Sequence, residues 1–103
     1  MPEKQLTIFD SMVDLLTDEN GKLETKQNEL WGRSEKLDAE IRANRKYLET
    51  ADWHDRKETE DDLRYAEKER TEISAELNKV YDKMKVNKTK MQEYIALQKE
   101  LVK

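Results

Sequence analysis

Apolar side chains recur at spacings of three and four residues through the C-terminal part of this chain, from Leu63 to Leu101. Written as heptads, nine of the twelve core positions in this stretch are apolar, and the exceptions are Arg70, Asn87 and Gln98. The pattern is typical of a coiled-coil seam, in which each apolar residue inserts between residues of a neighbouring helix. Because such a seam is stable only against a partner, the fold depends on which helix faces this one.

A second heptad series occupies the N-terminal half of the chain. Ten of its fourteen core positions between Leu6 and Ala51 are apolar. Only 35% of the 103 residues are apolar and 43% are charged, which is too little apolar surface for a compact globule but enough for paired helices with a narrow buried stripe. The sequence therefore predicts a single all-α domain over residues 1–103, built from long solvated helices.

The two series differ in phase near the middle of the chain. From Ala51 to the matching position Ala66 there are fifteen residues, where two whole heptads would be fourteen, and one unbroken coiled coil would have to absorb the extra residue. Asp52 is a suitable N-cap, and Asp55 would add negative charge to the first turn of a new helix. We therefore predict a helix over about 5–51, a turn over about 52–55 and a helix over about 56–102, forming an antiparallel coiled-coil hairpin.

Two asparagines in the seam predict the register of this hairpin. Residues that face each other in an antiparallel pair have numbers with a constant sum, and a sum of 107 places Asn20 opposite Asn87. Paired asparagines satisfy each other's amides and penalise slipped registers. A sum of 100 gives equally many favourable flanking ion pairs, so surface charge does not choose between the two.

Two features of the architecture stay open from the sequence. Asn20-Gly21 can end the first helix with a left-handed residue, or it can lie inside a continuous helix. The same heptads would also suit a parallel dimer of extended helices.

Apolar residues outside the seam gather near the end where the two termini of the hairpin would meet. An apolar stripe this wide cannot be covered by two helices, so we expect a homo-oligomer, with a homodimer forming a four-helix arrangement, or a protein partner at this end. The candidate assembly residues are Ile8, Met12, Leu15, Ile95, Leu97 and Val102.

The predicted turn is strongly acidic and contains one tryptophan. Residues 49–62 hold seven acidic and two basic side chains, a net charge of −5. Acids in a first turn stabilise a helix N-terminus, which explains part of this cluster. An exposed tryptophan has the character of a binding hot spot, so we predict a partner-binding site. Its residues would be Trp53, Asp52, Asp55 and Glu58.

The sequence offers no pattern of catalytic or metal-binding residues. There is no cysteine and His54 is the only histidine, whereas zinc sites normally use two or more nitrogen or sulfur ligands. The net charge of −4 weakens attraction to nucleic acid. No apolar run approaches the roughly 20 residues of a membrane span. We therefore expect no enzyme activity, cofactor, metal, small-molecule substrate, nucleic-acid or membrane partner, and a cytoplasmic location.

These observations predict a non-enzymatic coiled-coil protein-binding module: a scaffold, adaptor or inhibitor that self-associates and docks a partner protein. One alternative is a regulator that inserts its acidic tip into the basic or metal-containing site of a nucleic-acid enzyme. A phage or plasmid assembly protein is another, supported only by the acidic helical composition.

Overall fold

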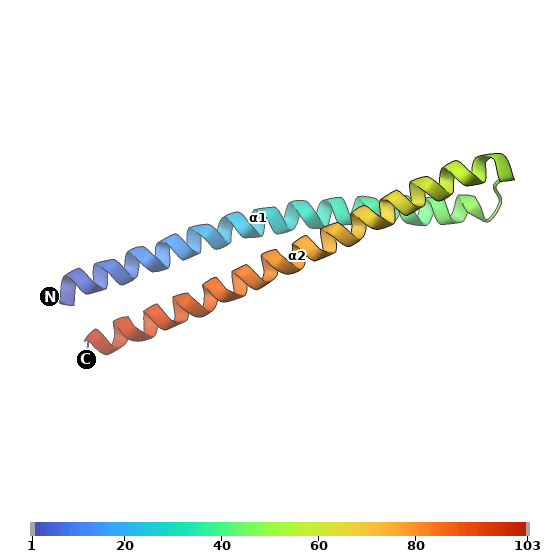
Figure 1. The fold of residues 1–103 in the computed structure, drawn as a ribbon. Helices are drawn as coiled ribbons and strands as arrows, with labels where there is room; N and C mark the ends of the chain where they lie inside the picture. The colour runs from blue at the N-terminus through green and yellow to red at the C-terminus, as the bar shows by residue number, and fades with distance from the viewer. Residues whose placement is uncertain (1, 103) are drawn as a thin grey trace. The chain divides into compact units, whose positions relative to one another are not determined.

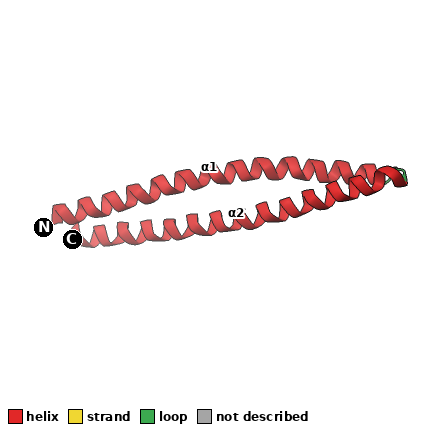
Figure 2. Cartoon of the chain, turned by 45° about the horizontal axis from the view of Figure 1, so that its top comes forward, coloured by secondary structure: helices red, strands yellow, loops and turns green. Residues whose placement is uncertain are grey.

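The chain folds into two long helices. A computed structural model describes residues 2–102, and the side chains from Ile8 to Leu101. Helix α1 spans Pro2–Leu48 and helix α2 spans Trp53–Val102. The helices run antiparallel (Figure 1), and among the described residues only the linker 49–52 lies outside them (Figure 2). The predicted all-α helical hairpin is confirmed.

The first helix ends in a tightened turn. The amide of Glu49 donates to the carbonyl of Lys46 at 3.3 Å, and that of Thr50 donates to Tyr47 at 3.2 Å. Both are bonds to the third residue back, which commonly satisfy the last carbonyls of an α-helix. Ala51, expected as the last core position of the first helix, therefore lies in the linker.

The second helix begins earlier than the sequence suggested. The amides of Asp55 and Arg56 donate to the carbonyl of Asp52 at 3.1 and 2.9 Å. Asp52 thus accepts the first helical hydrogen bonds, as an N-cap residue does. The expected turn at 52–55 was wrong by three residues, and Trp53 lies in the first turn of α2 rather than in the loop.

Helix α1 continues through Asn20-Gly21 without a break. Neither glycine has a positive φ, so the left-handed stop that Asn-Gly permits is not used. A Cβ added at Gly21 or Gly32 would meet no atom within 4 Å. Gly32 therefore does not make room for Trp31, whose side chain is exposed.

Replacing Gly21 or Gly32 with alanine is expected to raise the free energy of unfolding by about 1 kcal/mol for each site, because alanine restricts the unfolded chain and meets no obstacle in the helix. The two changes should add, since the sites lie roughly 16 Å apart along the helix. Urea unfolding followed by circular dichroism would measure both. Ala43→Gly, an exposed site on the same helix, should cost a similar amount; a loss of stability in Gly21→Ala would contradict the continuous helix.

The hairpin divides into two compact units. Unit 1 comprises Met1–Gln27 and Lys79–Lys103, and unit 2 comprises Asn28–Asn78. Each unit is a pair of antiparallel helical segments packed along the seam. In unit 1 the beginning of α1 and the end of α2 lie side by side (Figure 1).

The seam is buried more completely in unit 2 than in unit 1. In unit 2, seven seam residues are buried: Leu30, Ser34, Leu37, Ile41, Ala66, Ile73 and Leu77. Among the described side chains of unit 1, only Val80 and Asn87 are buried, while seam residues such as Leu16, Leu23 and Met91 stay half-buried. A two-helix seam in unit 1 therefore leaves apolar surface that a further helix could cover.

Polar residues in the seam find partners across the helix pair. The Nδ2 of Asn87 donates to the Oδ1 of Asn20 at 3.0 Å, and the Nδ2 of Asn20 lies 3.4 Å from the carbonyl of Met84. This is the register in which facing residue numbers sum to 107. In unit 2 the guanidinium of Arg70 reaches out of the seam to Asp38 at 2.9 Å.

Candidate interaction surfaces

An apolar stripe separate from the seam lies at the beginning of α1 in unit 1. Ile8, Met12 and Leu15 are 56%, 39% and 69% exposed, and their spacing of four and three residues places them on one face of the helix. Leu97 of α2 is also exposed and lines an apolar hollow together with Ile8. We call Ile8, Met12, Leu15 and Leu97 the terminal surface.

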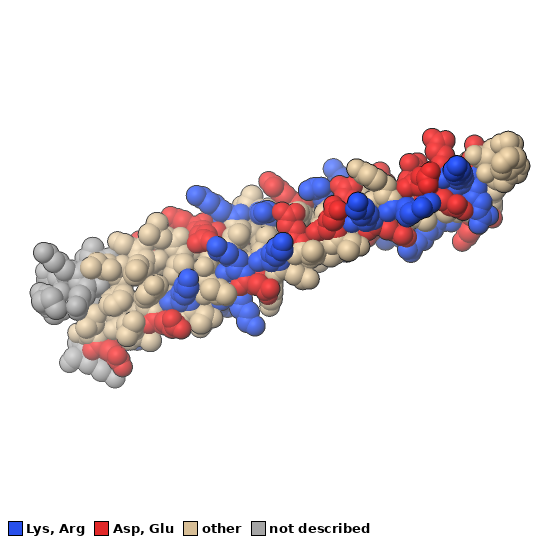
Figure 3. Space-filling model, in the orientation of Figure 1, with Lys and Arg blue, Asp and Glu red and all other residues tan. Residues whose placement is uncertain are grey.

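The terminal surface lies beside the seam rather than opposite it. At 100° per residue, the stripe on α1 is centred about 110° around the helix from the seam. A helix in a four-helix bundle contacts two neighbours at roughly this angle. Uncharged side chains also gather at this end on the face seen in Figure 3, where acidic and basic residues otherwise alternate. This part of α1 therefore resembles a helix of a four-helix bundle that packs against one neighbour, α2, and has no second neighbour covering the terminal surface.

Ile95, one of the expected assembly residues, does not belong to the terminal surface. Ile95 precedes Leu97 by two residues, which turns its side chain about 200° around the helix, and it does not line the hollow. Rotation around α2 therefore places Ile95 and Leu97 on opposite sides of the seam, and a role of Ile95 in assembly stays a prediction. The side chain of Val102 lies outside the described residues.

The residues predicted for partner binding lie together at the start of α2. The indole of Trp53 is 75% exposed and stacks on the ring of His54 with centroids 3.8 Å apart. Asp52, Asp55 and Glu58 follow at spacings of three residues, and all three are exposed. We call Trp53, Asp52, Asp55 and Glu58 the turn surface.

Sequence reasoning missed Tyr47 as a neighbour of the turn surface. The hydroxyl of Tyr47 donates to Oδ2 of Asp55 at 3.4 Å, linking the end of α1 to the start of α2. The negative charge of the Asp55 carboxylate raises the pKa of Tyr47, since ionisation would place two negative charges side by side. The contact could be predicted only with the exact position of the turn, because the turn determines which residues at the start of α2 lie near Tyr47.

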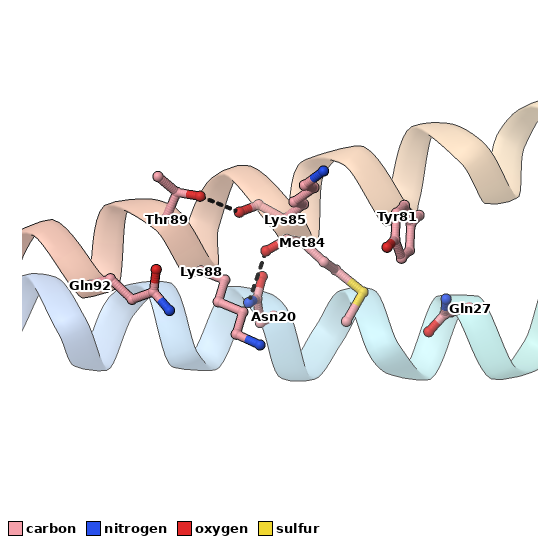
Figure 4. Close-up of a pocket in the computed structure, with 8 residues that line it drawn as sticks. All are labelled: Asn20, Gln27, Tyr81, Met84, Lys85, Lys88, Thr89 and Gln92. Carbon is pink, nitrogen blue, oxygen red and sulfur yellow. Dashed lines mark hydrogen bonds between the residues drawn. The ribbon is translucent and has the colours of Figure 1, made fainter.

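A polar hollow lies on the other side of the seam in unit 1. It is lined by Asn20 and Gln27 of α1 and by residues of α2 that include Tyr81, Lys85 and Lys88 (Figure 4). Lys88 extends across toward α1 beside Asn20. No carboxylate lines this hollow, so it holds hydrogen-bond donors without the paired acid and base that catalysis commonly requires.

Neither metal ligation nor membrane insertion is indicated by the described part of the chain. Within residues 2–102, no three histidine, aspartate or glutamate side chains come close enough to hold a metal ion. No helix over those residues is sufficiently long and apolar to cross a bilayer.

Comparisons with known proteins returned no relative. No protein-family model, no curated protein and no solved structure matches this chain.

Proposed function

We propose that this chain is a non-enzymatic coiled-coil protein-binding module, a scaffold, adaptor or inhibitor that self-associates through the terminal surface and offers the turn surface to a partner protein. The observation that carries the proposal is the second apolar stripe on α1, formed by Ile8, Met12 and Leu15 outside the seam. Isolated apolar residues on a surface need no explanation, but a contiguous stripe beside a half-buried seam favours a binding function.

The size of the terminal surface is consistent with a reversible association. Covering the exposed part of each of its four side chains would contribute on the order of 1 kcal/mol, or about 8 kcal/mol for two copies. Loss of translational and rotational freedom costs about 4–15 kcal/mol at the standard state, so the net affinity should be modest. Coverage of the half-buried seam of unit 1 would add to this gain. We therefore expect a dimer that dissociates on dilution.

The turn surface supports the docking part of the proposal. Hot spots in protein interfaces are enriched in tryptophan, and Trp53 is the most exposed large apolar residue described. The surrounding carboxylates would favour a partner with an apolar pocket and a basic rim, because opposite charges steer association and set its orientation.

Met12→Glu is expected to weaken self-association at least tenfold, because the dimer would have to desolvate two carboxylates at its centre. Sedimentation equilibrium over a wide concentration range measures this. Wild-type protein should show a reversible dimer, and the variant should be shifted toward monomer. Helix content by circular dichroism should not change, since Met12 lies outside the seam.

Ile95→Glu is the matched control. Ile95 is 40% exposed and Met12 is 39% exposed, and both lie in unit 1. The side chain of Ile95 is turned about 200° around α2 from that of Leu97, so Ile95 lies outside the terminal surface. The control should associate like wild type. Wild-type protein that is monomeric at every concentration would contradict the proposal. So would a result in which Ile95→Glu loses the dimer and Met12→Glu keeps it.

A further inference from the structure

We infer that the terminal surface binds the same surface of a second copy of this chain, with the two α1 helices packed antiparallel about a two-fold axis near Met12. The inference rests on the proposed self-association and adds its geometry. It follows from the order of apolar and charged residues along the two helices of unit 1.

The stripe on α1 is complementary to itself when reversed. Ile8 lies four residues before Met12, and Leu15 lies three residues after it. An antiparallel copy would therefore place Ile8 against Leu15 of the second copy, with Met12 against its own counterpart. All three exposed side chains would bury against apolar groups, as an isologous two-fold interface requires.

The parallel arrangement of two copies is less favourable. It would lay α1 over α2 of the second copy in the hairpin's own register, where facing numbers sum to about 107. Ile8 would then meet Glu100 and Leu15 would meet Glu93, and only Met12 would meet an apolar residue, Leu97. Two apolar side chains per copy would desolvate a carboxylate without pairing it.

Charges on α2 favour the same antiparallel arrangement. With the axis at Met12, the register of the hairpin places the centre of the α2 pair near residue 95. Residues equally far from that centre face each other, so Lys90 would lie opposite Glu100 of the second copy and Leu97 opposite its Glu93. One apolar side chain per copy would thus meet a carboxylate, against two in the parallel arrangement. Neither residue has an ion-pair partner within the described side chains. Two such symmetric pairs contribute little energy but oppose the reversed orientation.

Single cysteines can test this geometry cleanly because the chain contains none. Ser11 and Ala96 are exposed and small, and each lies at the height of the proposed axis, on α1 and α2 respectively. In the antiparallel dimer, Ser11→Cys should cross-link to itself with a short bismaleimide, and Ala96→Cys should do the same. The matched control is Thr25→Cys, two heptads from Ser11 on the same exposed row, about 39 Å along the helix axis from its counterpart in such a dimer.

We expect Ser11→Cys to give at least tenfold more covalent dimer than Thr25→Cys at a concentration where sedimentation shows the dimer. Cross-linking only in a mixture of Ser11→Cys with Ala96→Cys would establish the parallel arrangement and overturn the inference. A dimer by mass that cross-links no better than the control would overturn it too. These results leave self-association standing, whereas monomeric protein at every concentration removes both proposals.

Discussion

Ile73→Ala is expected to lower the free energy of unfolding by about 3 kcal/mol, the usual size of a large-to-small change in a well-packed core. Ile73 is 2% exposed, and the facing seam residue Ser34 is 1% exposed. Serine is too small to move into the space that isoleucine leaves, so the cavity would persist and add to the lost transfer energy. Against a typical total of about 5–15 kcal/mol for a folded domain, this is a large fraction.

Urea unfolding monitored by circular dichroism would measure the effect of Ile73→Ala. Val86→Ala is the matched control, because Val86 lies on the same helix and is 52% exposed. The control should change the free energy of unfolding by no more than about 0.5 kcal/mol. Equal effects of the two substitutions would show that burial along the seam does not hold unit 2 together.

The helices and their pairing could be predicted because the seam repeats over many heptads. A strict period of seven fixes which face of each helix is buried, and no single residue decides it. The register depended on two residues, Asn20 and Asn87, whose amides now lie 3.0 Å apart. A long-range match of this kind can be predicted from a sequence when the fold leaves only a few registers to compare.

The turn could not be placed to the residue because local backbone hydrogen bonds decide it. Heptads extended the first helix to Ala51, but the carbonyl of Asp52 already accepts the first bonds of α2. Once the turn moved, Trp53 joined a helix and Tyr47 came within reach of Asp55.

The unequal burial of the two units was also beyond the sequence pattern, because both halves have similar numbers of apolar seam positions. In unit 1 the seam contains the polar asparagine pair and the half-buried Met84 and Met91, whereas in unit 2 branched seam residues such as Ile41 and Ile73 are buried. The assembly residues were predicted from the apolar residues that lie outside the seam positions. Spacing along α2 groups Ile95 with Leu97, whereas rotation around the helix places the two on opposite sides of the seam.

Asn20→Leu is expected to destabilise the hairpin by about 2 kcal/mol, because it strands the side chain of Asn87, which is 3% exposed. Asn87→Leu should cost less, since Asn20 is only half-buried and retains its contact with the carbonyl of Met84. Urea unfolding of both single variants and of the double variant gives the coupling energy of the pair.

The double variant should recover most of the loss, because a leucine pair leaves no amide unsatisfied. It should also lose specificity, since the register with a sum of 100 no longer buries an unmatched asparagine. Spin labels at Lys22 and Lys85, whose numbers sum to 107, would give one sharp distance in wild type and a second population in the double variant. Two results together would contradict this role of the asparagines: Asn20→Leu leaves the free energy of unfolding unchanged, and the double variant gives a single sharp spin-label distance. They would mean that apolar packing alone sets the register. The asparagine pair would then be a tolerated defect of the seam rather than its alignment signal.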